Sequence, residues 1–417
     1  MVNDFKVSRL LKLHEYWSFW IAIISVITWS TKYTSVLLHN SIGLVILFLL
    51  ALFATILQNT VNKSLTNVYR NIKVNRLFLF FFLVYSINVI IRVPFGKAFD
   101  FQSIFSVLEI LIAIVVVFWF LYDNKCFRIF QILFILSVGI QSVFTCRELI
   151  NNFNIARIVV DENINPGGVW IFGDQGNFAT NAILIPILSY RAFTEKGILR
   201  VVLIFLCGAI AFAAAISQFG TALGLLLLGM PIFTIICFFF VKNQKWKSIS
   251  FLLLAFLLVG GYFFIGNADN PYLVNSFDKI IKVSQDAKSG GYGEKYESES
   301  RWFLADKSFR SFVSSPILGK GLGSIRYSDS VGGHSAFFDM LGFYGLFGAG
   351  AFISMLFLFL RAIWKRLQTF KNLESASTMA SMILLILVGV VNPYWEGQPT
   401  ALVILLARPF RFYDLKN

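Results

Sequence analysis

The sequence predicts an all-α, polytopic integral membrane protein with about 12 transmembrane helices. Of its 417 residues, 57% are hydrophobic and only 14% are charged, and the mean hydropathy is +0.73. A soluble domain usually carries about 25% charged residues. The apolar residues also form continuous runs, whereas the strands of a porin-type barrel alternate apolar and polar residues. These observations exclude a soluble enzyme, a disordered chain and a disulfide-rich secreted domain.

Twelve apolar runs account for this prediction, since one bilayer-spanning helix needs roughly 20 residues. The candidate spans, in chain order, are 16–31, 37–58, 77–93, 101–121, 127–148, 172–190, 198–216, 221–241, 248–266, 333–360, 377–392 and 398–410. The first run follows basic residues, as a signal peptide would. No small-residue cleavage site comes after it, so we expect an uncleaved first helix.

The distribution of basic residues orients these spans. With the N-terminus in the cytoplasm, the inside segments carry most of the 36 Lys and Arg residues, and each short outside loop carries two at most. This is the positive-inside pattern, and an even number of spans places both termini in the cytoplasm. The net charge of +14 therefore follows from membrane orientation, and no nucleic-acid partner is needed to explain it.

Two outside segments are long enough to carry function. We expect the whole chain, 1–417, to form a single transmembrane domain that contains both of them. The larger segment, about 267–333, joins the ninth and tenth spans, and the smaller one, about 149–171, precedes the sixth. Loops of such length are usually either functional or disordered.

The end of the larger loop carries several candidate site residues. Residues 298–313 (SESRWFLADKSFRSFV) predict an amphipathic helix near the membrane surface, and this helix contains Arg301 and Arg310. The segment SSPILGKGLG, residues 314–323, follows it. Its proline ends the helix, and its glycines allow a tight turn and a close backbone approach around Lys320.

The tenth span opens with GGHSAFFDMLGFYGLFGAG, residues 332–350. This places His334 at the outer face of the membrane and Asp339 inside an apolar span, where an ionisable residue is usually functional or paired. The five-residue step between them is about 500° of helix, so we do not expect the two to form a dyad. The sequence leaves open whether the glycines of this span only pack against neighbouring helices.

Two further outside patches carry amide side chains. Asn177 and Asn181 lie four residues apart on one face at the start of the sixth span. An ordinary helix cap with one interhelical hydrogen bond would explain this pair equally well. Gln218 is the long polar side chain of the outside turn 216–224.

In this order, the segments resemble the O-antigen ligase and polymerase superfamily, the Wzy and WaaL type of bacterial membrane proteins. That family shows an Arg-containing helix, an sPi-G-G-g turn, and then H-N-x-(aromatic/Leu)-x-x-L-x-x-x-G-x-x-G. The matching positions are Arg301, Ser315, Pro316, Gly319, Gly321, Gly323, His334, Leu341, Gly345 and Gly348. The chain departs from the family at Ser335, where Asn is common, and at Gln218, where the family often has an Arg that meets the donor's phosphates.

The resemblance implies glycosyl transfer at the outer face of the bacterial cytoplasmic (inner) membrane, without a metal, a cofactor or a nucleotide sugar. The donor would be an oligosaccharide on undecaprenyl diphosphate, and a sugar hydroxyl would accept it. A histidine suits the base that the hydroxyl needs, and Arg suits the departing diphosphate. We expect His334 as the base and Arg301 on the diphosphate.

The remaining candidates would support these two residues. We expect Asn177 and Asn181 to order the site, and Asp339 to hold the neighbours of His334. For the phosphate contact that is lost at Gln218, the sequence offers four substitutes and does not choose among them. They are Arg157, Arg310, Lys320 and Arg326.

The resemblance favours a polymerase of lipid-linked repeat units of O-antigen lipopolysaccharide or capsule, because such polymerases often match the motif only in part. In the bilayer it would work beside the flippase and the chain-length regulator of the same pathway. One alternative is a ligase that transfers the glycan to another acceptor. Another is a lipid-linked saccharide transporter or flippase, which the twelve spans and the intramembrane acids Glu109 and Asp339 also fit.

Overall fold

The protein is an all-α membrane protein. The computed structural model describes residues 19–28, 49–50, 53, 65–92, 101–152, 155, 175–217, 219–243, 301–322 and 331–410. All regular elements in these ranges are helical, and none is a strand. By length and composition, six of the described helices can cross a membrane: Ile104–Leu121, Asn124–Asn151, Gly197–Ile216, Gly220–Phe240, Ala336–Phe370 and Leu373–Val391. The count of about 12 spans stays a prediction.

Most of the described helices begin and end within a few residues of a predicted span, and α4 (Leu65–Val74) falls where the sequence predicts a loop. The described helices are Phe19–Thr28, α4, α5 (Arg76–Arg92), α6 (Phe101–Val116) with the π-helical turn η2 (Val117–Leu121), α7 (Asn124–Asn151), α9 (Gln175–Thr194), α10 (Gly197–Ile216), α11 (Gly220–Phe240), α14 (Arg301–Ser314), the 3-10 turn η3 (Lys320–Leu322), α16 (Ala336–Phe370), α17 (Leu373–Val391) and α18 (Gln398–Ala407). The predicted span 248–266, most of 37–58, and most of the predicted loops 149–171 and 267–333 lie outside the described residues.

One helix is longer than the sequence predicts. The tenth span is predicted to end at residue 360, but α16 continues to Phe370. The added turns contain the exposed residues Arg361 and Lys365. Lys and Arg are good helix formers, so the chain can stay helical after its apolar run has ended.

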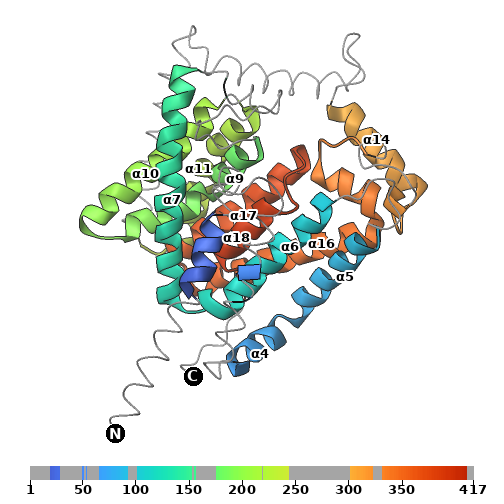
Figure 1. Cartoon of the computed structure of the whole chain (residues 1–417), viewed down its shortest axis with the longest axis horizontal. Helices are drawn as coiled ribbons and strands as arrows, with labels where there is room; N and C mark the ends of the chain where they lie inside the picture. The colour runs from blue at the N-terminus through green and yellow to red at the C-terminus, as the bar shows by residue number, and fades with distance from the viewer. Residues whose placement is uncertain are drawn as a thin grey trace.

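The helix α17 lies between two groups of helices (Figure 1). It contacts α9 and α11, which pack with α10 and α7, and it also contacts α16, which packs with α5 and α14. Small residues allow helices to approach closely in a membrane. The first half of α17 is rich in them, with Ser375, Ala376, Ser377, Ala380 and Ser381 all buried.

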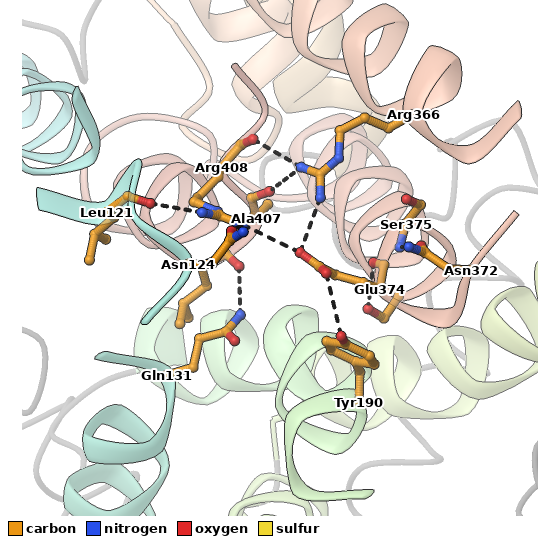
Figure 2. A network of polar contacts seen from close by, with 12 residues as sticks. Leu121, Asn124, Gln131, Tyr190, Arg366, Asn372, Glu374, Ser375, Ala407 and Arg408 are labelled. Atoms are coloured by element: carbon orange, nitrogen blue, oxygen red, sulfur yellow. Dashed lines mark hydrogen bonds and ion pairs between the residues drawn. The ribbon is translucent and has the colours of Figure 1, made fainter. Parts of the chain in front are cut away.

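Glu374, at the start of α17, is the centre of a polar network at one end of the bundle (Figure 2). Its carboxylate accepts a hydrogen bond from Arg366 of α16 at 3.1 Å and one from Tyr190 of α9 at 3.4 Å. A guanidinium nitrogen of Arg408, just after α18, lies 3.7 Å from the same carboxylate. One acid therefore joins four segments that are far apart in the sequence.

Arg408 extends this network to α6 and α7. Its guanidinium donates to the Leu121 carbonyl, the last one of η2, at 2.9 Å and to the Asn124 side chain at 3.1 Å. It also lies 3.7 Å from the centre of the Phe127 ring. We call this end of the bundle the Arg408 end. The helix ends that meet in its network are those that the sequence predicts on the cytoplasmic side.

The helix α16 is interrupted at Gly345, where φ is +65° and ψ is −172°. The interruption leaves backbone groups without partners inside the helix, and in a bilayer the protein itself must bond them. The chain after α14 does so. The Leu346 N–H donates to the Pro316 carbonyl at 2.8 Å, and the Phe347 N–H donates to the Ile317 carbonyl at 3.1 Å. These bonds hold the turn that follows α14 against the interruption.

The substitution Gly345→Ala tests this interruption. Its backbone conformation is essentially restricted to glycine, and an added Cβ would lie 2.4 Å from the Gly319 nitrogen. We expect a loss of at least about 1 kcal/mol, seen as a lower Tm in detergent. The control is Gly350→Ala, because a Cβ at that position meets no atom within 4 Å. Equal Tm values for the two variants would contradict the interruption.

Glu195, in the turn between α9 and α10, pairs with Arg128 of α7. The Arg128 Nε donates to Glu195 Oε1 at 2.8 Å, and a second Arg128 nitrogen bonds the other carboxylate oxygen. Arg191 lies 3.5 Å away. The hydrogen bonds from Arg128 lower the pKa of Glu195 below its ordinary value of 4.5.

This pair predicts a defined pH dependence of stability. A carboxylate with a lowered pKa stabilises the fold above its unfolded pKa and loses that contribution as the pH falls through its folded pKa. The Tm difference between the wild type and Glu195→Gln should therefore be constant above about pH 4.5 and shrink below it. Thermal unfolding in detergent from pH 7 to pH 3 measures this, with Glu148→Gln on α7 as the control. A difference that grows on acidification would contradict the ion pair.

Candidate functional site

The candidate site lies at the end of the bundle where α16 begins, which we call the His334 end. His334 itself is exposed, in the short segment between Val331 and the start of α16. Ser335 caps the helix, since its side chain accepts from the Phe338 N–H at 3.5 Å. The same hydroxyl donates to the Val390 carbonyl at 2.6 Å and so fixes the start of α16 to the end of α17.

Asp339 holds the backbone on both sides of His334. Its Oδ1 accepts from the Gly333 N–H at 3.2 Å, and its Oδ2 accepts from the Ser335 N–H at 3.0 Å. The Ser308 hydroxyl of α14 donates to Oδ1 at 2.5 Å. Asp339 is only 1% exposed, so these hydrogen bonds satisfy a buried carboxylate. The geometry agrees with the expectation that Asp339 holds the neighbours of His334.

Ser308 also places α14 against the start of α16. Its oxygen accepts from the Gly332 N–H at 2.8 Å. Two glycines allow this contact, because a Cβ at Gly332 would lie 2.2 Å from the Leu304 carbonyl and one at Gly342 would lie 2.6 Å from the Ser308 carbonyl. Gly342 therefore packs closely against the backbone of α14.

Further contacts bring the other predicted patches to this end. The Ala336 N–H donates to the Asn392 carbonyl at 3.2 Å, and the Asn392 side chain donates to the Thr221 hydroxyl of α11 at 2.9 Å. Phe219, just before α11, pairs with Phe178 of α9, with ring centres 5.8 Å apart. The start of α9 and the turn before α11 thus lie on the same side of the bundle as His334.

The predicted amides of α9 lie at this end in the core. Asn177 and Asn181 are 4% and 6% exposed, on the first turns of α9. Such burial suits residues that order a site, and it equally suits an interhelical hydrogen bond. Their position beside Phe178 keeps them at the His334 end.

The predicted basic residues have different outcomes. Arg310 is exposed and forms an ion pair with Asp306 at 2.6 Å. It follows Ser308 by two residues, which is about 200° around α14. It therefore points away from Asp339. Lys320 lies half-buried on η3. The described part of Arg301 is its backbone, which opens α14. Outside the described residues lie Arg157, Gln218 and Arg326.

Arg92, the last residue of α5, was not among the predicted site residues. It is 5% exposed, and its guanidinium donates to the Asn88 side chain at 2.9 Å and to the Tyr344 carbonyl at 3.2 Å. It also donates to the Leu318 carbonyl. Arg92 thus bonds the last carbonyl before the interruption of α16 and the turn that follows α14. In the sequence, Arg92 stands out only as a charged residue at the end of an apolar run, which does not by itself indicate a site residue.

The chemistry open to this end follows from its geometry. A fixed backbone presents one exposed imidazole, and histidine in general exchanges protons near neutral pH. Within the described ranges, no group of three or more His, Cys, Asp or Glu residues could hold a metal ion.

The substitution Asp339→Asn tests how the loop is held. It replaces one acceptor oxygen by a donor that faces other donors, so about 2–3 kcal/mol of hydrogen bonding to a charged group is lost. We expect faster amide exchange at residues 332–335, measured by hydrogen–deuterium exchange mass spectrometry. The matched control is Asp306→Asn, whose carboxylate pairs with the exposed Arg310. Unchanged exchange at residues 332–335 would show that Asp339 does not hold this loop.

No family model and no curated protein matches this chain. What the His334 end can do chemically therefore follows from its own residues and their geometry.

Proposed function

We propose that the chain is a membrane glycosyltransferase that polymerises undecaprenyl-diphosphate-linked oligosaccharide repeat units of a surface polysaccharide. It would cross the bacterial cytoplasmic membrane about 12 times, with both termini inside and the His334 end outside. The acceptor hydroxyl oxygen would bond to the anomeric carbon of the donor sugar as the bond from that carbon to the diphosphate oxygen breaks. His334 would take the hydroxyl proton, and the lipid diphosphate would leave.

One observation carries this proposal. His334 is exposed at the start of a membrane helix, and the backbone amides on both sides of it are bonded to the buried Asp339. A general base has to be reachable by substrate and held in place at the same time, and this arrangement meets both needs. The resemblance of residues 300–350 to the O-antigen ligase and polymerase superfamily supports the same reaction.

A polymerisation assay tests the proposal. The purified full chain receives a synthetic lipid-diphosphate-linked repeat unit, with no nucleotide sugar and no ion gradient, and the products are separated on a gel. We expect a ladder of lengthening saccharides. In His334→Ala we expect the rate to fall by about 10²–10⁴, the usual contribution of a general base. The control is His14→Ala, at a residue predicted in the cytoplasm.

The other outcomes assign other functions. A donor that stays unchanged until a separate acceptor glycan is added would indicate a ligase. A ladder that persists in His334→Ala would remove His334 from the reaction.

A transporter is the second candidate, because α16 is interrupted inside an apolar span. Interrupted helices form the substrate and ion sites of many secondary transporters, where their free ends face the ligand. Here the amides after the interruption bond Pro316 and Ile317, and Arg92 bonds the carbonyl before it. Because these groups are occupied by the protein, the interruption favours a fixed frame over an ion site. Gradient-driven movement of a lipid-linked saccharide in proteoliposomes, without a product ladder, would reverse this choice.

A further inference from the structure

The turn between α14 and the interruption of α16 lies against a buried positive charge that no described acid pairs with. Arg92 is 5% exposed, and its guanidinium bonds the Asn88 side chain and the carbonyls of Tyr344 and Leu318. It also lies 5.9 Å from the centre of the Phe343 ring and 5.4 Å from that of the Tyr344 ring. All of these described partners are uncharged, and burying an ion without an opposite charge is costly.

One nitrogen of this guanidinium is available for a further acceptor. The Arg92 Nη1 is buried and has no hydrogen-bond partner among the described residues. It lies against Gly321, where an added Cβ would be 2.9 Å from it. A guanidinium binds phosphate through several N–H groups at once, and it does so most strongly where water is excluded.

A second cation is the sequence neighbour of Gly321. Lys320 precedes Gly321 in η3 and is half-buried. Within the described part of the chain, its ammonium group takes part in no ion pair or hydrogen bond. Lys320 on this turn and Arg92 packed against it, with no acid bonded to either among the described residues, favour an anionic ligand over a structural ion pair.

The surface around the turn is apolar. Val313, Ile317 and Leu318 are 61%, 68% and 46% exposed. Leu346 and Phe347, whose amides bond this turn, are 55% and 51% exposed. A hydrocarbon chain can lie along such a surface beside the two cations, which is the pattern that a lipid with a charged head requires.

We propose that Arg92, Lys320 and the Gly319–Gly321 turn bind the phosphate group of a membrane lipid, whose chain lies along the exposed apolar side chains of the turn. Nη1 is covered in this structure, so binding would shift η3 and uncover it. The inference rests on the proposed function only for the identity of the lipid. If that function holds, the phosphate is the donor's diphosphate. Otherwise it is a phospholipid headgroup.

Hydrogen–deuterium exchange of the full wild-type chain in a neutral detergent tests the site. The probes are undecaprenyl diphosphate and phosphatidylglycerol, and each is matched by the same chain without phosphate, undecaprenol and diacylglycerol. We expect altered exchange at residues 316–322 and at the end of α5 with at least one phosphate-bearing probe and with neither matched lipid. No change with either phosphate, or the same change with the matched lipids, would overturn the proposal.

Substitutions then test whether Arg92 and Lys320 bind the phosphate. Arg92→Gln and Lys320→Gln should each raise the half-maximal probe concentration about tenfold, the loss of one charge-assisted hydrogen bond. Arg361→Gln, at an exposed residue near the other end of α16, should leave it unchanged. If Arg92→Gln does not fold, Lys320→Gln decides, because no described contact depends on that ammonium. An unchanged half-maximal concentration in Lys320→Gln, and in Arg92→Gln where it folds, would overturn the proposal.

The two lipids separate this site from the proposed function. A response to the diphosphate and not to phosphatidylglycerol identifies the donor as the ligand. Equal responses identify a headgroup site. A phosphate response together with a failed polymerisation assay would leave the site standing and remove the proposed function, and a ladder without any phosphate response would do the reverse.

Discussion

The backbone groups freed at Gly345 set the arrangement of the His334 end, because lipid offers them no partner. The turn after α14 bonds the amides that follow the interruption, and Arg92 bonds the carbonyl that precedes it. These bonds fix α14, and α14 brings Ser308 to Asp339. Asp339 then holds the loop that carries His334. The backbone groups freed at Gly345 are thus connected to the loop of His334 through the turn after α14, Ser308 and Asp339.

The two ends of the bundle satisfy their arginines in different ways. At the Arg408 end, Glu374 forms an ion pair with Arg366 and lies close to Arg408. Glu195 forms an ion pair with Arg128. At the His334 end, the described partners of Arg92 are an amide, two carbonyls and the rings of Phe343 and Tyr344. Paired charges fix helix ends in place. A buried charge with neutral partners keeps most of its attraction for an anion, so only the second arrangement suits ligand binding.

The sequence predicted the helices far better than the contacts of the site. Long apolar runs mark membrane helices directly, so α7, α10 and α11 begin and end within a few residues of their predicted spans. The interruption at Gly345 was not predicted, because glycine is common in unbroken membrane helices. Ser308 and Arg92 were missed for the same reason, since their roles exist only once α16 is interrupted. Arg310 was a plausible phosphate ligand by charge, but it lies on the face of α14 opposite Ser308, where it pairs with Asp306 one turn earlier.

The burial of Asp339 gives this carboxylate a structural role at the His334 end. Its carboxylate receives hydrogen bonds from Ser308, Gly333 and Ser335, and it is 1% exposed. Moving a proton onto it would break contacts that hold the loop. His334, by contrast, is exposed. The acid therefore bonds the main chain on both sides of His334 and fixes the backbone that carries the imidazole.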